Sequence, residues 1–397
     1  MIESINRLCG MSVLVVSLAM TDFAAADAGA QPVETGSASR VDSPNKGSSP
    51  IPITVTPAVK PNKESEWVVL PIPKSSPAIG TGLQLVGARF FKADAKSQPS
   101  VFGAGAGYYS SDTWFAGVGG AYNFAADRWR IMAGVGYVDA SYDFYGIGND
   151  AGDATDIKFP IRQTGTAAMV KVLRLIGANW YAGIGYRYLD SQVSLRVSLP
   201  QAPELEEILN TGVRIVAQGP TLSAVYDTRD LNLNPRTGSY VSIEGLTSTK
   251  SLDSEETYQR LTINASHYWP LSDDYVLAGR MTVCGVTDNA PFFDLCLYGS
   301  DNDLRGYTVG RYQDLTMFAA QAELRAQFTP RWGGVVFAGI GEVAPDFGDM
   351  NSGDLLPAGG VGVRWMAAPE NRVNVRADLA WGQGDDALFY LSIGEAF

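Results

Sequence analysis

The sequence has few charged residues and no long apolar run. Charged residues make up 18% of the 397-residue chain, whereas a typical soluble domain has about 25%. A membrane-spanning helix needs about 20 apolar residues in a row, and the sequence does not supply them. Hydrophobic residues still make up 46% of the chain, which is too many for a mostly disordered protein. These features exclude a helical membrane protein and count against two or three soluble domains.

Residues that carry much of enzyme chemistry are also scarce. His267 is the only histidine, and in a strand its neighbour Ser266 would face the opposite way. The sequence holds no G-x-S-x-G motif and no cluster of metal ligands, so we expect no catalytic residue, no metal and no cofactor. An outer-membrane enzyme that depends on His267 is therefore the least favoured alternative. The net charge of -12 argues against nucleic acid as a partner.

What the sequence has instead is a regular alternation of polar and apolar residues. From Gln321 to Gln327 every second residue is polar, and the residues between them are apolar. Successive side chains of a strand point to opposite faces, so such a segment has one dry face and one wet face. Together with 43 Gly and 11% aromatic residues, this alternation is typical of a transmembrane β-barrel.

The N-terminal region indicates export. Residues 1–26 contain a basic residue, Arg7, a short apolar segment from Met11 to Met20, and a small-residue cleavage site at Ala24–Ala26, which together are typical of a signal peptide. Residues 27–65 are rich in Pro, Ser and Gly and predict a short disordered periplasmic linker. The folded domain should then span residues 66–397, in the outer membrane of a Gram-negative bacterium.

The connections between the predicted strands alternate between short and long. In bacterial barrels the short turns face the periplasm and the long loops face outside, and the number of strands is even. Fifteen strands follow from the alternation, and Glu66–Pro71 can supply a sixteenth that starts in the periplasm. The fifteen are predicted at 79–92, 100–110, 112–124, 128–142, 159–174, 178–197, 213–228, 238–249, 257–269, 274–287, 315–329, 332–343, 357–367, 371–382 and 387–397. We therefore predict an all-β, sixteen-stranded antiparallel barrel.

Three motifs follow one another along this barrel. A short turn carries Asp227, Arg229 and Asp230, followed by Asn234-Pro235-Arg236-Thr237-Gly238. The longest predicted loop carries Leu304-Arg305-Gly306-Tyr307, and the next strand carries Gln321-Ala322-Glu323-Leu324-Arg325. Over residues 66–397 these motifs resemble the barrel of the bacterial surface antigen family, which includes the BamA- and TamA-like outer-membrane assembly and translocation proteins.

The resemblance implies that the loop bearing Leu304, Arg305, Gly306 and Tyr307 folds back into the lumen, where its arginine pairs with acidic residues of the wall. Glu323 is the partner that we predict, because a buried carboxylate is costly unless it is paired. A guanidinium can bind a carboxylate through two parallel hydrogen bonds. The alternative is an Arg305 that stays solvated in an external loop.

The sequence departs from the family pattern at several points. A second lumen acid is expected on the strand at 332–343, where Gly339 stands instead. Glu395 interrupts the apolar face of the last predicted strand, and Ser300 replaces one of two glycines before the arginine loop. Residues 27–65 are too few for a polypeptide-transport-associated (POTRA) domain, so the expectation is a barrel-only member. The terminal aromatic residue, Phe397, also matches a barrel targeting signal.

Two further features concern structure more than chemistry. Residues Asp227, Arg229, Asp230, Pro235 and Gly238 are expected to shape a charged turn, with Pro and Gly setting its backbone angles. Cys284 and Cys296 flank the base of the long loop, and an exported protein meets an oxidising compartment, so a disulfide is predicted. Two reduced thiols are the alternative.

The resemblance implies a protein that assists the insertion or translocation of a polypeptide or lipid at the outer membrane. Its expected partners are outer-membrane lipid and either an unfolded polypeptide cargo or a separate periplasmic protein. The alternative is a passive, porin-like diffusion channel. A loop held in the lumen by Arg305 would block such a channel.

Overall fold

The computed structural model describes residues 65–76, 79–154, 159–196, 206, 210–231, 234–299, 303–368, 372–383 and 387–397. The predicted signal peptide and residues 27–64 of the predicted linker lie outside the described residues. No helix in the described part of the chain is long and apolar enough to cross a membrane.

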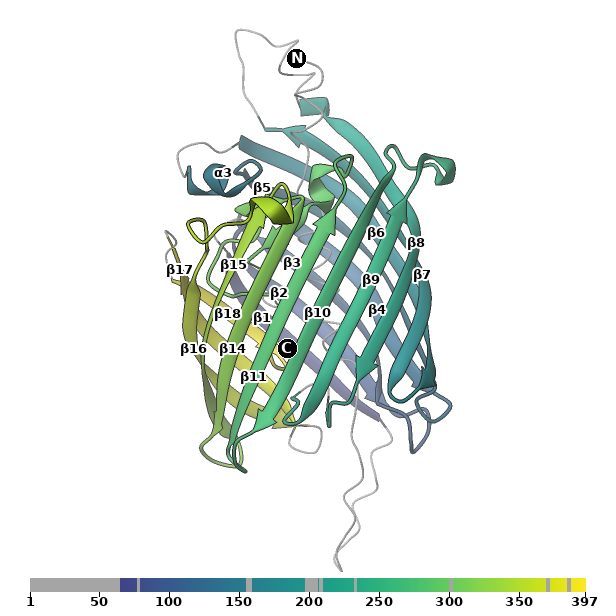
Figure 1. The fold of residues 1–397 in the computed structure, drawn as a ribbon, viewed down its shortest axis with the longest axis vertical. Coiled ribbons are helices and arrows are strands. Elements are labelled where there is room, and N and C mark those ends of the chain that lie inside the picture. Colours follow the sequence, from purple (N-terminus) through teal and green to yellow (C-terminus); the bar gives the residue numbers. More distant parts are fainter. Residues whose placement is uncertain are drawn as a thin grey trace, which may run out of the picture.

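Sixteen antiparallel strands form one sheet that curls into a nearly closed barrel (Figure 1). This confirms the predicted fold, with strand ends that differ from the prediction by a few residues. Each strand pairs with the next along the chain, except that β11 pairs directly with β14. The strands are β1 (Ser65–Ser76), β2 (Gly80–Phe91), β3 (Ser100–Tyr109), β4 (Trp114–Phe124), β5 (Trp129–Phe144), β6 (Phe159–Gly177), β7 (Trp180–Leu195), β8 (Val213–Asp227), β9 (Gly238–Ser248), β10 (Tyr258–Pro270), β11 (Tyr275–Val286), β14 (Thr316–Gln327), β15 (Trp332–Ala344), β16 (Ala358–Ala368), β17 (Val373–Gly382) and β18 (Leu388–Ile393).

The two ends of the barrel differ in their connections. Residues 125–128, 178–179, 271–274 and 328–331 make tight turns at one end, here called the short-turn end. The described parts of the connections 145–158, 196–212, 287–315 and 345–357 lie at the other, the long-loop end. They carry the helix α3 (Asn149–Asp153), the 3₁₀ turns η2 (Phe292–Asp294) and η3 (Phe347–Asp349), and a small sheet of β12 (Cys296–Tyr298) and β13 (Tyr312–Asp314). A further 3₁₀ turn, η1 (Lys250–Leu252), lies between β9 and β10.

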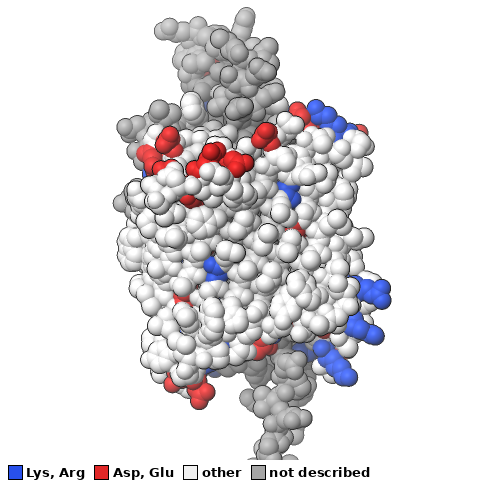
Figure 2. Space-filling view, in the orientation of Figure 1, with Lys and Arg blue, Asp and Glu red and all other residues white. Residues whose placement is uncertain are grey.

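The alternation in the sequence places apolar side chains outside and polar ones inside. On β14, the side chains of Gln321, Glu323 and Arg325 are buried in the lumen, while Leu324 faces outward. Ile184 and Leu222 are each 67% exposed on the outer wall. Figure 2 shows this wall as mostly uncharged between its two ends. The dry face of each strand is therefore the outer face, as a membrane-embedded barrel requires.

The last strand is shorter than predicted. β18 ends at Ile393, and Gly394 adopts a left-handed φ of 86° that turns the chain inward. Glu395 then lies in the lumen, where its carboxylate accepts hydrogen bonds from Arg364 at 2.7 Å and Asn374 at 2.6 Å. The prediction that the strand continues to Phe397 with Glu395 on its apolar face was wrong, because a glycine in this conformation ends the alternation.

The first and last strands leave a seam in the sheet. β1 and β18 lie next to one another and are the two ends of the strand order, and no pairing register joins their described residues. β1 has 12 residues and β18 has 6. The inward turn at Gly394 thus leaves much of the β1 edge without a strand that could cover it.

Candidate functional site

The connection between β11 and β14 folds into the lumen and not outward into solvent. Its aromatic side chains Phe293, Tyr298 and Tyr307 are wholly buried, and so is Arg305. Tyr307 packs against Tyr298 and Tyr312, with ring centroids 5.2 and 5.4 Å away. The loop therefore fills the interior of the barrel below the long-loop end.

Arg305 is bound between two strands of the barrel wall. Its guanidinium donates hydrogen bonds to the carboxylates of Glu323 on β14 and Asp378 on β17. The same guanidinium lies over the ring of Phe337 on β15, 3.5 Å from the ring centroid. All three charged side chains are wholly buried. Such charges are tolerated away from water only when they are paired and hydrogen-bonded, so this arrangement fixes where the loop must lie.

The two carboxylates belong to a larger buried network. Glu323 also accepts a hydrogen bond from Arg325 at 2.7 Å. Asp378 also accepts hydrogen bonds from Arg364 and, at 3.1 Å, from Arg376. Because Arg364 in turn binds Glu395, the network joins the loop, three wall strands and the inward-turned end of the chain.

The residues on either side of Arg305 also contact the barrel wall. Gly306 has a φ of 126°, and a Cβ there would lie 2.9 Å from the backbone of Trp381. Its N–H donates to the hydroxyl of Tyr390 at 3.0 Å. The Tyr307 hydroxyl donates to the carbonyl of Pro357 at 2.6 Å. The Leu-Arg-Gly-Tyr motif thus contains one glycine that must approach a wall strand closely and three side chains that are buried against the walls.

Gly339 provides room for Leu304. A Cβ at Gly339 would lie 2.7 Å from Cδ1 of Leu304 and 2.4 Å from the carbonyl oxygen of Ala320. An aspartate at position 339 would therefore collide with the loop. The second acid comes instead from Asp378 on β17, which the sequence-based prediction missed. Its signal was present in the alternating polar row Asn374, Arg376 and Asp378, all of which face the lumen.

A second ionic contact holds the beginning of the loop to a different wall. Asp294 in η2 is wholly buried, and it accepts hydrogen bonds from Arg187 on β7, from Arg260 on β10 at 3.3 Å, and from the hydroxyl of Tyr258. Burial raises the pKa of the Asp294 carboxyl, but the two arginines outweigh burial and hold this pKa below its ordinary value. Nothing in the sequence distinguished Asp294 from other loop aspartates. The loop is thus bound to β7 and β10 at one point and to β14 and β17 at another.

Cys284 on β11 and Cys296 on β12 form a disulfide. The bond closes a loop with a sequence separation of 12 residues and joins β12, inside the lumen, to the wall. It lies between the two ionic contacts in the path of the chain and limits how far β12 can move from β11.

The turn between β8 and β9 reaches across the short-turn end. Asp230 accepts a hydrogen bond from Arg372, which directly precedes β17 on the far side of the barrel, at 2.6 Å. Asp227 is bound instead by Arg130 at 3.2 Å and by Arg229 at 3.0 Å. These residues hold the turn across the opening.

The same turn contacts the network around Arg305. The carbonyl of Pro235 accepts a hydrogen bond from Arg325 at 3.3 Å, and Arg325 also binds Glu323. Gly238 has a φ of 98°, and a Cβ there would lie 2.2 Å from the carbonyl oxygen of Thr228. Arg325 therefore links the short-turn motif to the loop motif through one side chain.

Two other predicted residues lie apart from the loop. Phe397 lies inside the barrel, where its carbonyl accepts a hydrogen bond from Arg325 at 2.8 Å and its ring centroid is 6.3 Å from that of Tyr268. Its role as a targeting signal stays a prediction. His267 is on the outward face, against the ring of Trp269 and with Nδ1 2.6 Å from the hydroxyl of Ser239.

Comparison with known proteins places this geometry in a family. Residues 107–397 match the Omp85 superfamily domain. The chain is similar to BamA from Haemophilus ducreyi lacking POTRA domains 1–3, with 15% identity and a TM-score of 0.52, over 83% of this chain and 69% of that one. It is also similar to CdiB from Acinetobacter baumannii, with 9% identity and a TM-score of 0.55, over 84% of this chain and 60% of that one. For CdiB from Escherichia coli the identity is 10% and the TM-score 0.56, over 84% of this chain and 63% of that one. The chain thus covers less than two thirds of either CdiB chain.

Replacing Arg305 with Ala should destabilise the barrel and release the loop. The substitution leaves two buried carboxylates with fewer cations between them, and removal of one partner from a buried ion pair typically costs about 3–5 kcal/mol. Unfolding in urea and limited proteolysis of residues 287–315 measure the two effects. Arg162→Ala is the matched control, because Arg162 pairs with Asp139 but has a side chain that is 54% exposed, and it should cost no more than about 1 kcal/mol. Equal effects of the two substitutions would contradict the buried arrangement.

Replacing Gly339 with Ala should also destabilise the protein, by about 1–3 kcal/mol, because the new methyl group must push Leu304 or the wall aside. Gly245 on β9 is the matched control, since a Cβ there would meet no atom within 4 Å. Gly245→Ala should change the free energy of unfolding by less than about 0.5 kcal/mol. Urea titrations of both variants make the comparison, and a neutral Gly339→Ala would show that the loop does not need this space.

Proposed function

The chain belongs to the Omp85 superfamily, and from this membership we propose that it is an outer-membrane barrel that assists the insertion or translocation of a polypeptide or lipid. The short-turn end then faces the periplasm, and the proposal assigns no catalytic step to the chain. Besides family membership, the observation that supports this proposal is the seam between β1 and β18.

The seam supports a polypeptide as the substrate. Strands at the edge of a sheet present unpaired N–H and C=O groups, to which another extended chain can add as a strand. In a lipid bilayer such groups are costly unless they are bonded. β1, with 12 residues, extends well beyond what the 6 residues of β18 can cover. An incoming strand that pairs with β1 would satisfy groups that the barrel itself leaves open.

The buried loop counts against a passive channel. A diffusion pore needs a continuous water-filled lumen, whereas here Arg305, Tyr298 and Tyr307 lie wholly buried inside the barrel. Two groups of ion pairs hold the loop to the wall, one at β7 and one at β14 and β17. Substrate is therefore proposed to pass along the seam and not through an open lumen.

Site-specific photocrosslinking tests the role of the seam. A photoreactive residue is placed at Val69 on β1, which is 61% exposed, or at Leu261 on β10, which is 48% exposed and lies on the far side of the barrel. In cells that express the full chain, Val69 should crosslink to unfolded outer-membrane precursors several-fold more than Leu261, because only Val69 lies beside an unpaired edge. Crosslinking to precursors that is equal at both positions, or absent at both, would contradict a polypeptide substrate at the seam.

Single-channel recording separates the proposal from the porin alternative. The wild-type protein in a planar bilayer should show no large, steady openings, because the loop fills the lumen. Arg305→Ala should increase the frequency of openings. Large and steady openings of the wild-type protein would favour the passive channel instead.

A further inference from the structure

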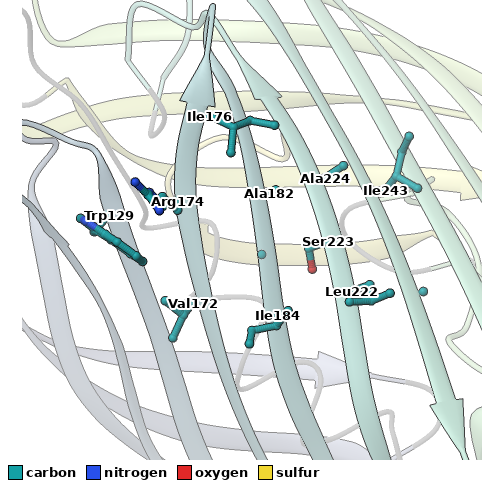
Figure 3. A pocket seen from close by; sticks show the side chains of 12 residues that line it. Trp129, Val172, Arg174, Ile176, Ala182, Ile184, Leu222, Ser223, Ala224 and Ile243 are labelled. Atoms are coloured by element: carbon teal, nitrogen blue, oxygen red, sulfur yellow. The ribbon is translucent and has the colours of Figure 1, made fainter.

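A groove lies on the outer wall of the barrel, away from both the loop and the seam. It has a volume of about 760 Å³ and is formed by the outward faces of β5 to β9, close to their short-turn ends (Figure 3). Its lining is almost entirely apolar, and one arginine, Arg174, stands at its edge.

The register of the strands explains the hollow. Ala182 on β7 is the cross-strand partner of Ala224 on β8, and the two alanines lie side by side where the wall has no bulk. Ile184 and Leu222, also partners, form the next row toward the middle of the barrel and are each 67% exposed. Ile243 on β9, the partner of Ala224, closes the row on the side away from Arg174. Two small side chains surrounded by large ones thus make a trough that an extended hydrocarbon chain fits.

One end of the groove is basic and aromatic. Arg174 on β6 is the cross-strand partner of both Trp129 and Ala182, and its guanidinium lies 5.3 Å from the centroid of the Trp129 ring. Figure 3 shows these two side chains next to one another at the side of the groove. Within the described residues Arg174 forms no ion pair with a carboxylate, and it is the one basic residue that lines the groove.

We propose that this groove binds a glycerophospholipid of the leaflet at the short-turn end, with an acyl chain over Ala182 and Ala224 and the phosphate at Arg174. A guanidinium matches the geometry of a phosphate and can donate two hydrogen bonds to it. A tryptophan ring beside the arginine is typical of the level at which headgroups meet hydrocarbon.

The depth of the groove fits this occupant. Arg174 lies three residues before the end of β6 at Gly177, which is about 10 Å along a strand. Trp180 and Tyr226, whose ring centroids are 5.2 Å apart, lie two residues nearer the short-turn end than Ala182 and Ala224, as residues of an aromatic girdle do. The phosphate would therefore lie at Arg174, at one side of the alanine row, and the acyl chain would extend from there over the alanines toward Ile184 and Leu222.

The site is independent of the proposed function. β5 to β9 lie roughly opposite the seam between β1 and β18 in the strand order. A lipid bound there would fix the position of this wall relative to the bilayer. The strands beside the seam would remain free to move. Lipid binding at the groove and crosslinking at Val69 are measured in separate experiments. One of the two proposals can therefore fail while the other stands.

Native mass spectrometry of the full chain with added phosphatidylglycerol tests the proposal. The wild-type protein should retain one lipid molecule, and Arg174→Ala should lower the apparent affinity for it by about tenfold, because a charge-assisted hydrogen bond is lost. Ala182→Leu/Ala224→Leu fills the trough on the outer face and should also reduce retention by about tenfold. Arg214→Ala is the control, because Arg214 is an exposed arginine whose Nη2 lies 2.7 Å from Asp190 toward the other end of the wall.

The outcomes separate a lipid from a free anion. Reduced retention in both Arg174→Ala and Ala182→Leu/Ala224→Leu, with Arg214→Ala unchanged and no displacement by inorganic phosphate, supports the site. Equal retention in all variants would overturn it, and so would an equal loss in Arg214→Ala. Displacement of the lipid by inorganic phosphate alone would show an anion site without an acyl groove and would likewise overturn it. The gel mobility of unheated samples checks that each variant is a folded barrel.

Discussion

The binding of Arg305 between Glu323 and Asp378 is the interaction on which the rest of the lumen depends. A guanidinium and two carboxylates are wholly buried together, and each of them would be costly to bury without the others. Because Glu323 lies on β14 and Asp378 on β17, the arginine can satisfy both only if the loop enters the lumen. The positions of Leu304, Gly306 and Tyr307 then follow from that one constraint.

The same network connects parts of the chain that are far apart in sequence. Arg325 joins Glu323 to Pro235 in the turn at the short-turn end, and Arg364 joins Asp378 to Glu395 beyond the end of β18. The inward course of the chain after Gly394 is what shortens β18, and a short β18 leaves the edge of β1 open. The closed lumen and the open seam are thus two consequences of one set of buried charges.

The sequence predicted the architecture well because a barrel depends on local alternation and on an even number of strands. Arg305 and Glu323 were predictable because each lies in a motif. Asp378 was missed because the partner of Arg305 depends on which strands of the wall the loop lies against, and alternation does not contain that information. Glu395 was misplaced for a related reason: a single left-handed glycine, Gly394, reverses which face the following residues occupy. The trough at Ala182 and Ala224 likewise appears only when the register of β7 and β8 is known.

A double-mutant cycle between Arg305 and Asp378 tests the central claim most directly. The free energy of unfolding in lipid vesicles is measured for the wild type, Arg305→Met, Asp378→Asn and the double variant. If the buried contact organises the lumen, the double variant should lose less than the two single variants together, with a coupling energy of about 1–3 kcal/mol. Losses that add within about 0.5 kcal/mol would contradict the account, because they would mean that the two side chains stabilise the barrel independently.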